Sequence, residues 1–138
     1  MNLPNIAIRL SLLSGALAVL ASALGAHAMA GAGESLIRSF ETAARMHLIH
    51  SLVMLVLSLW WQKQPGSRLL GAACGFILFG MLLFSGAIYA RVMSGDAFFS
   101  KLAPIGGLLL ITGWIMPVFA IFKDRGTGMK VPDERDQS

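Results

Sequence analysis

Residues 69–92 read LLGAACGFILFGMLLFSGAIYARV, and Arg91 is the only charged residue among them. A transmembrane helix needs about 20 mainly apolar residues, so this stretch predicts one membrane span. Residues 10–30 and 105–122 meet the same criterion. Residues 42–61 meet it only if that helix carries three ionisable side chains across the bilayer. The sequence therefore predicts an all-α integral membrane protein, with four transmembrane helices in a compact bundle.

Composition supports this fold class. The chain has 138 residues, of which 56% are hydrophobic and 13% charged, with a mean hydropathy of +0.71. A soluble domain carries about 25% charged residues, and a small one cannot bury this much apolar surface. The net charge of +4 comes from basic residues scattered beside apolar spans. A nucleic-acid interface would cluster them with aromatic residues, so we expect none.

The charged residues also predict how the chain crosses the membrane. The N-terminus, the second connection and the C-terminal segment hold seven Lys and Arg, against four in the first and third connections. The positive-inside rule then places both termini in the cytoplasm. Residues 1–123 form the predicted membrane domain, and residues 124–138 a flexible polar tail. Ala26-His27-Ala28 could instead end a cleaved signal peptide, although the apolar stretch before it is long for one.

Ionisable groups at membrane depth are expensive, which makes them functional candidates. His50 lies about 16 Å from Trp61 along a helix, near the bilayer centre. Three interpretations compete for this polar region. His47, His50 and His27 could ligate a metal or haem, or His50 could couple proton or solute transport with Glu41 nearby. In the third, His50 forms a hydrogen bond to Thr112 between helices, without any reaction.

The remaining polar groups are expected at the outer half of the bundle. Glu41 and Arg45 would pair with each other or with Arg91 and Asp96 at headgroup level. The single cysteine, Cys74, excludes an intramolecular disulfide, a CxxC pair and a cysteine zinc site. We therefore predict no cofactor and no metal centre, and treat Cys74 as a packing residue.

Small residues recur along three of the predicted helices. Ser14, Ala18 and Ser22 follow one another every four residues, and Gly71 and Gly75 form a GxxxG motif that Gly86 continues. Such stripes let helix backbones approach closely in lipid. Along the last span, the packing glycines are predicted to be Gly106 and Gly113.

Several of these segments are similar to a family of small four-helix membrane proteins, the domain of unknown function 423, which includes transmembrane protein 256. The matching segments, in chain order, are GALAV at 15–19, LGAH at 24–27, FETA at 40–43, HSL at 50–52, FSGAIY at 84–89, PIGG at 104–107 and GW at 113–114. The family usually has tyrosine where Met46 stands here.

The resemblance implies a retained first helix and a bacterial inner membrane or its organellar equivalent, and it implies no activity. It points to His27, Glu41, His50, Ser85, Tyr89, Pro104, Gly106 and Gly107, which adds Gly107 to the packing positions. Together with Arg45 from the predicted outer cluster, the polar residues of this set (His27, Glu41, His50, Ser85 and Tyr89) are the candidates for a common polar site.

The sequence offers packing surfaces and no complete catalytic set, so we expect no enzyme. It favours an accessory or assembly factor of a larger membrane complex, whose partners are the lipid bilayer and either other membrane subunits or further copies of the chain. The alternative is a homo-oligomeric carrier or channel for a proton or small solute, centred on His50.

Overall fold

The computed structural model describes residues 2–29 and 31–127. Its elements are α1 (Leu3–Ala28), α2 (Glu34–Lys63), α3 (Arg68–Met81), a π-helical turn η1 (Leu82–Gly86), α4 (Ala87–Ser94), a 3-10 helix η2 (Ala97–Lys101) and α5 (Ala103–Thr127). Four segments are long and apolar enough to cross a membrane, namely 3–25, 34–63, 68–94 and 97–122. The predicted four-span, all-α fold is confirmed.

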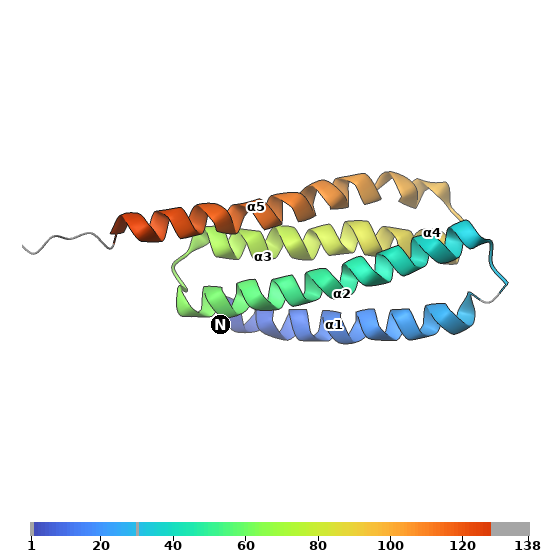
Figure 1. The fold of residues 1–138 in the computed structure, drawn as a ribbon, viewed down its shortest axis with the longest axis horizontal. Coiled ribbons are helices and arrows are strands. Elements are labelled where there is room, and N and C mark those ends of the chain that lie inside the picture. Colours follow the sequence, from blue (N-terminus) through green and yellow to red (C-terminus); the bar gives the residue numbers. More distant parts are fainter. Residues whose placement is uncertain (1, 30, 128–138) are drawn as a thin grey trace, which may run out of the picture.

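The helices lie side by side in the order α1, α2, α3, α5 (Figure 1). α1 packs on α2, α5 packs on α3 and η1, and the centre is the contact of α2 with α3, η1 and α4. The helices α1 and α5 are therefore the two edges of the row. α1 begins and α5 ends at the same end of the bundle (Figure 1). An apolar core joins the four spans: Ala7, Met54, Leu57, Ala73, Cys74, Ile77, Met81 and Leu110.

Local chemistry sets the ends of the helices. Pro4 stands in the first turn of α1, where its missing N–H removes no helical bond. The Ser67 hydroxyl accepts from the backbone N–H of Leu70 at the start of α3. After α4, Gly95 adopts a φ of +73°, a left-handed cap that glycine adopts without a Cβ penalty.

Several helices extend beyond the predicted spans. α1 begins at Leu3 rather than residue 10. α2 begins at Glu34, so helix extends through the amphipathic stretch before the predicted span at residues 42–61, as the i,i+4 acid–base pairs of that stretch indicate. α5 runs through Pro117 to Thr127, which puts residues 124–127 in the helix rather than in the tail. Residue 30 and the remaining predicted tail, 128–138, lie outside the described residues.

The face of α1 that contacts α2 differs from the predicted stripe. Ser11, Ala18 and Gly25 are buried at intervals of seven residues, whereas Ser22 is exposed. A Cβ on Gly25 would collide with the ring of Phe40. A seven-residue repeat keeps one helical face on its neighbour, which explains why the four-residue spacing drifts off it.

Glycines also bring α3 close to its neighbours. A Cβ added to Gly71 would lie 2.6 Å from the Trp61 ring, and one on Gly113 would lie 2.8 Å from Ile77. A Cβ on Gly106 would meet the backbone of Leu83 and Phe84. At each of these three predicted positions, an added Cβ would collide with a neighbouring helix.

Other predicted packing glycines make no close approach to another helix within the described residues. Gly75 and Gly86 have no atom within 4 Å of an added Cβ, contrary to prediction, and Gly107 reaches only the Phe84 ring at 3.9 Å. Gly80, which is not among the predicted packing positions, faces Leu110, whose backbone nitrogen would lie 2.9 Å from an added Cβ. Close approach therefore follows which helices are neighbours rather than the GxxxG spacing.

Candidate functional site

A chain of hydrogen bonds crosses three helices through His47. Its Nε2 lies 2.9 Å from the Ser14 hydroxyl of α1, and its Nδ1 lies 3.5 Å from the Tyr89 hydroxyl of α4. The Ser51 hydroxyl of α2 is 2.9 Å from that of Ser14 and 2.8 Å from the His47 carbonyl oxygen. We call Ser14, His47, Ser51 and Tyr89 the His47 chain.

Two proton arrangements satisfy the His47 chain without moving a heavy atom. The Ser51 hydroxyl proton faces two oxygen acceptors, the Ser14 oxygen and the His47 carbonyl, and more weakly the Met81 sulfur at 3.8 Å. If Ser51 donates to Ser14, then Ser14 donates to Nε2 and Nδ1 donates to Tyr89. If Ser51 donates to the carbonyl, every other bond reverses. Both arrangements leave the imidazole neutral, because each ring has one donor and one acceptor nitrogen.

His50 is held separately, between α2 and α5. Its side chain is 4% exposed. Its Nδ1 lies 2.8 Å from the Met46 carbonyl oxygen, and the indole Nε1 of Trp114 donates to its Nε2 at 3.2 Å. A carbonyl only accepts and an indole N–H only donates, so these partners fix a neutral imidazole with its proton on Nδ1. Both ring nitrogens are thereby engaged.

The predicted partner of His50 was therefore wrong. The Thr112 hydroxyl donates to the Leu108 carbonyl of its own helix at 2.9 Å, which is the usual local bond of a threonine within a helix. The longer indole of Trp114 reaches across instead, with its ring nearly perpendicular to the imidazole at 87°.

Ser85 lies in the π-helical turn η1, where its side chain is 1% exposed. Its hydroxyl donates to the Ala43 carbonyl of α2 at 2.9 Å. This carbonyl belongs to the turn of α2 that precedes His47. A π-helical turn widens one turn of a helix and often occurs at functional sites. Here it presents Ser85 to α2 on the same stretch as the His47 chain.

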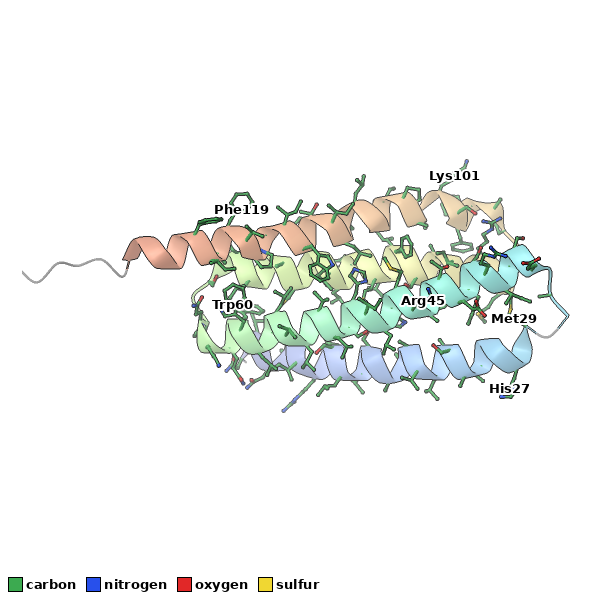
Figure 2. The ribbon with its side chains drawn as sticks, viewed as in Figure 1. His27, Met29, Arg45, Trp60, Lys101 and Phe119 are labelled. Carbon is green, nitrogen blue, oxygen red and sulfur yellow. The ribbon has the colours of Figure 1, made fainter. Side chains whose placement is uncertain are left out.

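The other predicted site residues lie apart from this region. His27 is exposed, and its side chain points away from the other helices (Figure 2). Glu41 and Arg45 are exposed along a groove of about 650 Å³ between α1 and α2. Within the described residues these two do not pair with each other, nor with Arg91 or Asp96.

The predicted six-residue site is thus dispersed. Tyr89 belongs to the His47 chain, Ser85 binds α2 nearby, and His50 is bound on the α5 side. The structure adds Ser14 and Ser51, which look like packing residues in the sequence, and Trp114. The signal for His47 was that it stands three residues before His50, but the two imidazoles contact different helices. Within the part of the chain that the structure describes, no three His, Cys, Asp or Glu side chains could hold a metal ion together.

The His47 chain predicts an effect of removing one hydroxyl. We expect Ser14→Ala to lower the free energy of unfolding by about 1 kcal/mol, because hydrogen bonds between membrane helices contribute about 0.6–1.7 kcal/mol. Ser22→Ala is the matched control, since that hydroxyl bonds only to the Ala18 carbonyl of its own helix. Unfolding in mild detergent, followed by circular dichroism, measures both. Equal losses would contradict the interhelical role of Ser14.

Known proteins resemble this chain over nearly its whole length. The family described as Protein of unknown function (DUF423) matches residues 21–107. A UPF0382 membrane protein of Staphylococcus aureus (strain bovine RF122 / ET3-1) is 31% identical over 122 residues, covering 86% of this chain and 97% of the relative. UPF0382 membrane protein YwdK of Bacillus subtilis (strain 168) is 29% identical over 117 residues, covering 84% and 95%. No solved structure matches the chain. The family match includes His47, His50 and Tyr89, and excludes Ser14 and Trp114.

Proposed function

Because this chain belongs to the DUF423 family of membrane proteins of unknown function, we propose that it is a non-enzymatic accessory or assembly factor of a larger membrane complex. We place it in the bacterial inner membrane with both termini in the cytoplasm. The seven-to-four distribution of Lys and Arg supports that orientation, as does the common end at which α1 begins and α5 ends.

The observation that carries the proposal is that His50 is buried with both ring nitrogens hydrogen-bonded. Its two ring nitrogens are engaged by Met46 and Trp114, and the imidazole is 4% exposed. A transport group must exchange a proton or ligand with water during its cycle, whereas a group that ties helices together needs fixed partners. His50 has the fixed partners, which favours a structural role for this buried side chain.

The outer faces of the row suit an accessory subunit. Five leucines of α1 are 56–65% exposed, namely Leu12, Leu13, Leu17, Leu20 and Leu24. α5 exposes a similar set: Ile111, Ile115, Val118, Phe119 and Phe122. Each edge helix has one main helical neighbour, so its outer face is open to lipid or to another membrane helix.

The absence of an enzymatic role is part of the proposal. The structure does bring together one hydroxyl–imidazole pair, Ser14 and His47, which sequence spacing did not predict. Acyl-transfer enzymes use such a pair where substrate can reach the hydroxyl. Neither residue lines the groove between α1 and α2 or the cavity between α2 and α4. The Ser14 hydroxyl also bonds to Ser51.

If the protein is instead a carrier, His47 is a better candidate than His50 for the group that transfers the proton. The His47 chain can reverse its hydrogen bonds, which is a property that a proton relay uses. Under this alternative the protein is a homo-oligomer, and His47→Gln slows proton flux into vesicles that contain the purified protein, while His27→Gln leaves the flux unchanged.

Native mass spectrometry of the protein extracted gently from its own membrane tests the accessory role. We expect partner subunits in a fixed ratio. Two triple alanine variants should show which edge helix contacts the partner. One replaces Leu13, Leu17 and Leu20 of α1, and the other replaces Ile111, Ile115 and Val118 of α5. One variant should lose the partner while the other retains it. A homo-oligomer without other subunits, unchanged in both variants, would contradict the accessory role.

A further inference from the structure

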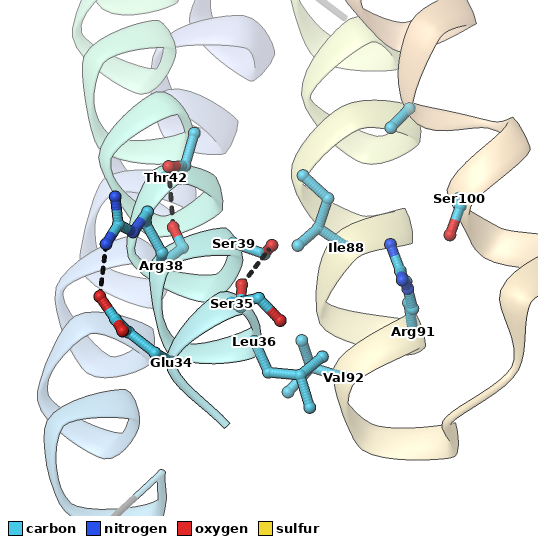
Figure 3. Close-up of a pocket in the computed structure, with 11 residues that line it drawn as sticks. Glu34, Ser35, Leu36, Arg38, Ser39, Thr42, Ile88, Arg91, Val92 and Ser100 are labelled. Atoms are coloured by element: carbon cyan, nitrogen blue, oxygen red, sulfur yellow. Dashed lines mark hydrogen bonds and ion pairs between the residues drawn. The ribbon is translucent and has the colours of Figure 1, made fainter. Parts of the chain in front are cut away.

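A cavity of about 580 Å³ opens between α2 and α4, next to the start of α5 (Figure 3). It lies at the end of the bundle opposite the start of α1 and the end of α5, where α2 begins and α4 ends. Helix ends of this kind reach the headgroup region of a bilayer. The cavity is therefore placed where lipid phosphates lie.

The charged groups of this cavity are two guanidinium groups and one carboxylate. Arg38 forms an ion pair with Glu34. Arg91 is exposed and lines the cavity, and it has no ion-pair partner among the residues that the structure describes. The lining residues thus carry a net charge of +1 (two basic, one acidic), and that charge belongs to Arg91.

Hydroxyl groups surround these charges. The hydroxyls of Ser39 and Thr42 donate to the backbone carbonyls of Ser35 and Arg38, each at 2.8 Å. The Ser100 hydroxyl is different, because its oxygen is buried and has no hydrogen-bond partner within the described residues. A buried hydroxyl without a partner is costly, so a ligand that accepts from it would be favoured. In Figure 3, Ser100 and Arg91 lie on the same side of the cavity.

The remaining walls are apolar. Leu36, Ile88, Val92 and Ala103 contribute hydrocarbon surface to the same cavity. A free inorganic anion would gain nothing from these walls, whereas a phospholipid would place its acyl chains along them and its phosphate at the polar rim. The combination of an unpaired guanidinium, an unpartnered hydroxyl and apolar walls matches a molecule that has both an anionic phosphate and apolar acyl chains.

We propose that this cavity binds an anionic phospholipid, with Arg91 pairing with the phosphate and the Ser100 hydroxyl donating to a phosphate oxygen. The Arg91 guanidinium provides the charge-assisted hydrogen bonds that favour phosphate. The net positive charge of the lining favours a headgroup that is anionic overall over a zwitterionic one. This site is independent of the proposed accessory role.

Binding of phosphatidylglycerol and phosphatidylcholine to the purified full-length protein in nonionic detergent tests the site, with native mass spectrometry as the readout. We expect phosphatidylglycerol to bind about tenfold more tightly than phosphatidylcholine. Arg91→Gln should abolish this preference, and Ser100→Ala should weaken phosphatidylglycerol binding about fivefold. Arg45→Gln is the matched control, because Arg45 is exposed like Arg91 but lines the groove between α1 and α2.

The result that would overturn the proposal is equal binding of both lipids by the wild-type protein, or the same loss in Arg91→Gln and Arg45→Gln. Displacement of phosphatidylglycerol by millimolar inorganic phosphate would assign the site to a soluble anion instead. Arg91 is exposed, so Arg91→Gln should unfold at the wild-type temperature. That measurement separates lost binding from lost folding.

Discussion

Gly106→Ala should lower the free energy of unfolding by about 1–3 kcal/mol, the usual cost of forcing an extra methyl into a packed interior. At this position α5 crosses η1 so closely that a Cβ would collide with the backbone of Leu83 and Phe84. A flexible side chain could rotate away from a new methyl group, but a helical backbone cannot. The two helices would have to separate, and the contact of α5 with η1 would loosen.

Gly75→Ala provides the control for this prediction. No atom lies within 4 Å of a Cβ added to Gly75, and alanine is about 1 kcal/mol better than glycine inside a helix. Gly75→Ala should therefore be neutral or stabilising. Thermal unfolding of the two variants in detergent, followed by circular dichroism, compares them directly. Equal destabilisation would mean that the contact between α5 and η1 is not as close as described.

His50→Ala is expected to cost about 2–4 kcal/mol, in the range measured when a large buried side chain is truncated to alanine. The variant leaves a cavity between α2 and α5, and it leaves the Trp114 indole N–H and the Met46 carbonyl without their side-chain partner. An unpaired polar group in a membrane interior adds to the packing loss. The unfolding transition should shift accordingly.

His27→Ala is the matched substitution for His50→Ala. The His27 side chain is exposed and points away from the other helices (Figure 2). Its truncation should leave the unfolding transition unchanged. If both variants unfold alike, then His50 does not tie α2 to α5, and the main support for a structural role of this residue is lost.

Much of the fold could be predicted because membrane spans follow from length and hydropathy alone. The four spans follow from runs of apolar residues and the breaks between them. The early start of α1 could not be predicted in this way, because Arg9 interrupts the apolar run near its N-terminus. The π-helical turn at residues 82–86 has no sequence signal at all in an otherwise apolar stretch.

The candidate site was predicted less well, for a geometric reason. Sequence spacing shows which residues share a face of one helix, but not which helix that face contacts. His47 and His50 are three residues apart, yet one contacts α1 and α4 and the other contacts α5. Ser14 and Ser51 carry no sequence mark of a polar site, because serine is equally common as a small packing residue in membrane helices.

The shared end of α1 and α5 has a consequence for how such chains could be joined. Because Leu3 and Thr127 lie at the same end of the row, two copies fused head to tail would need only a linker on one side of the membrane. Both copies would then have the same orientation. A duplicated gene of this kind would encode parallel repeats related by an axis along the membrane normal, rather than inverted ones.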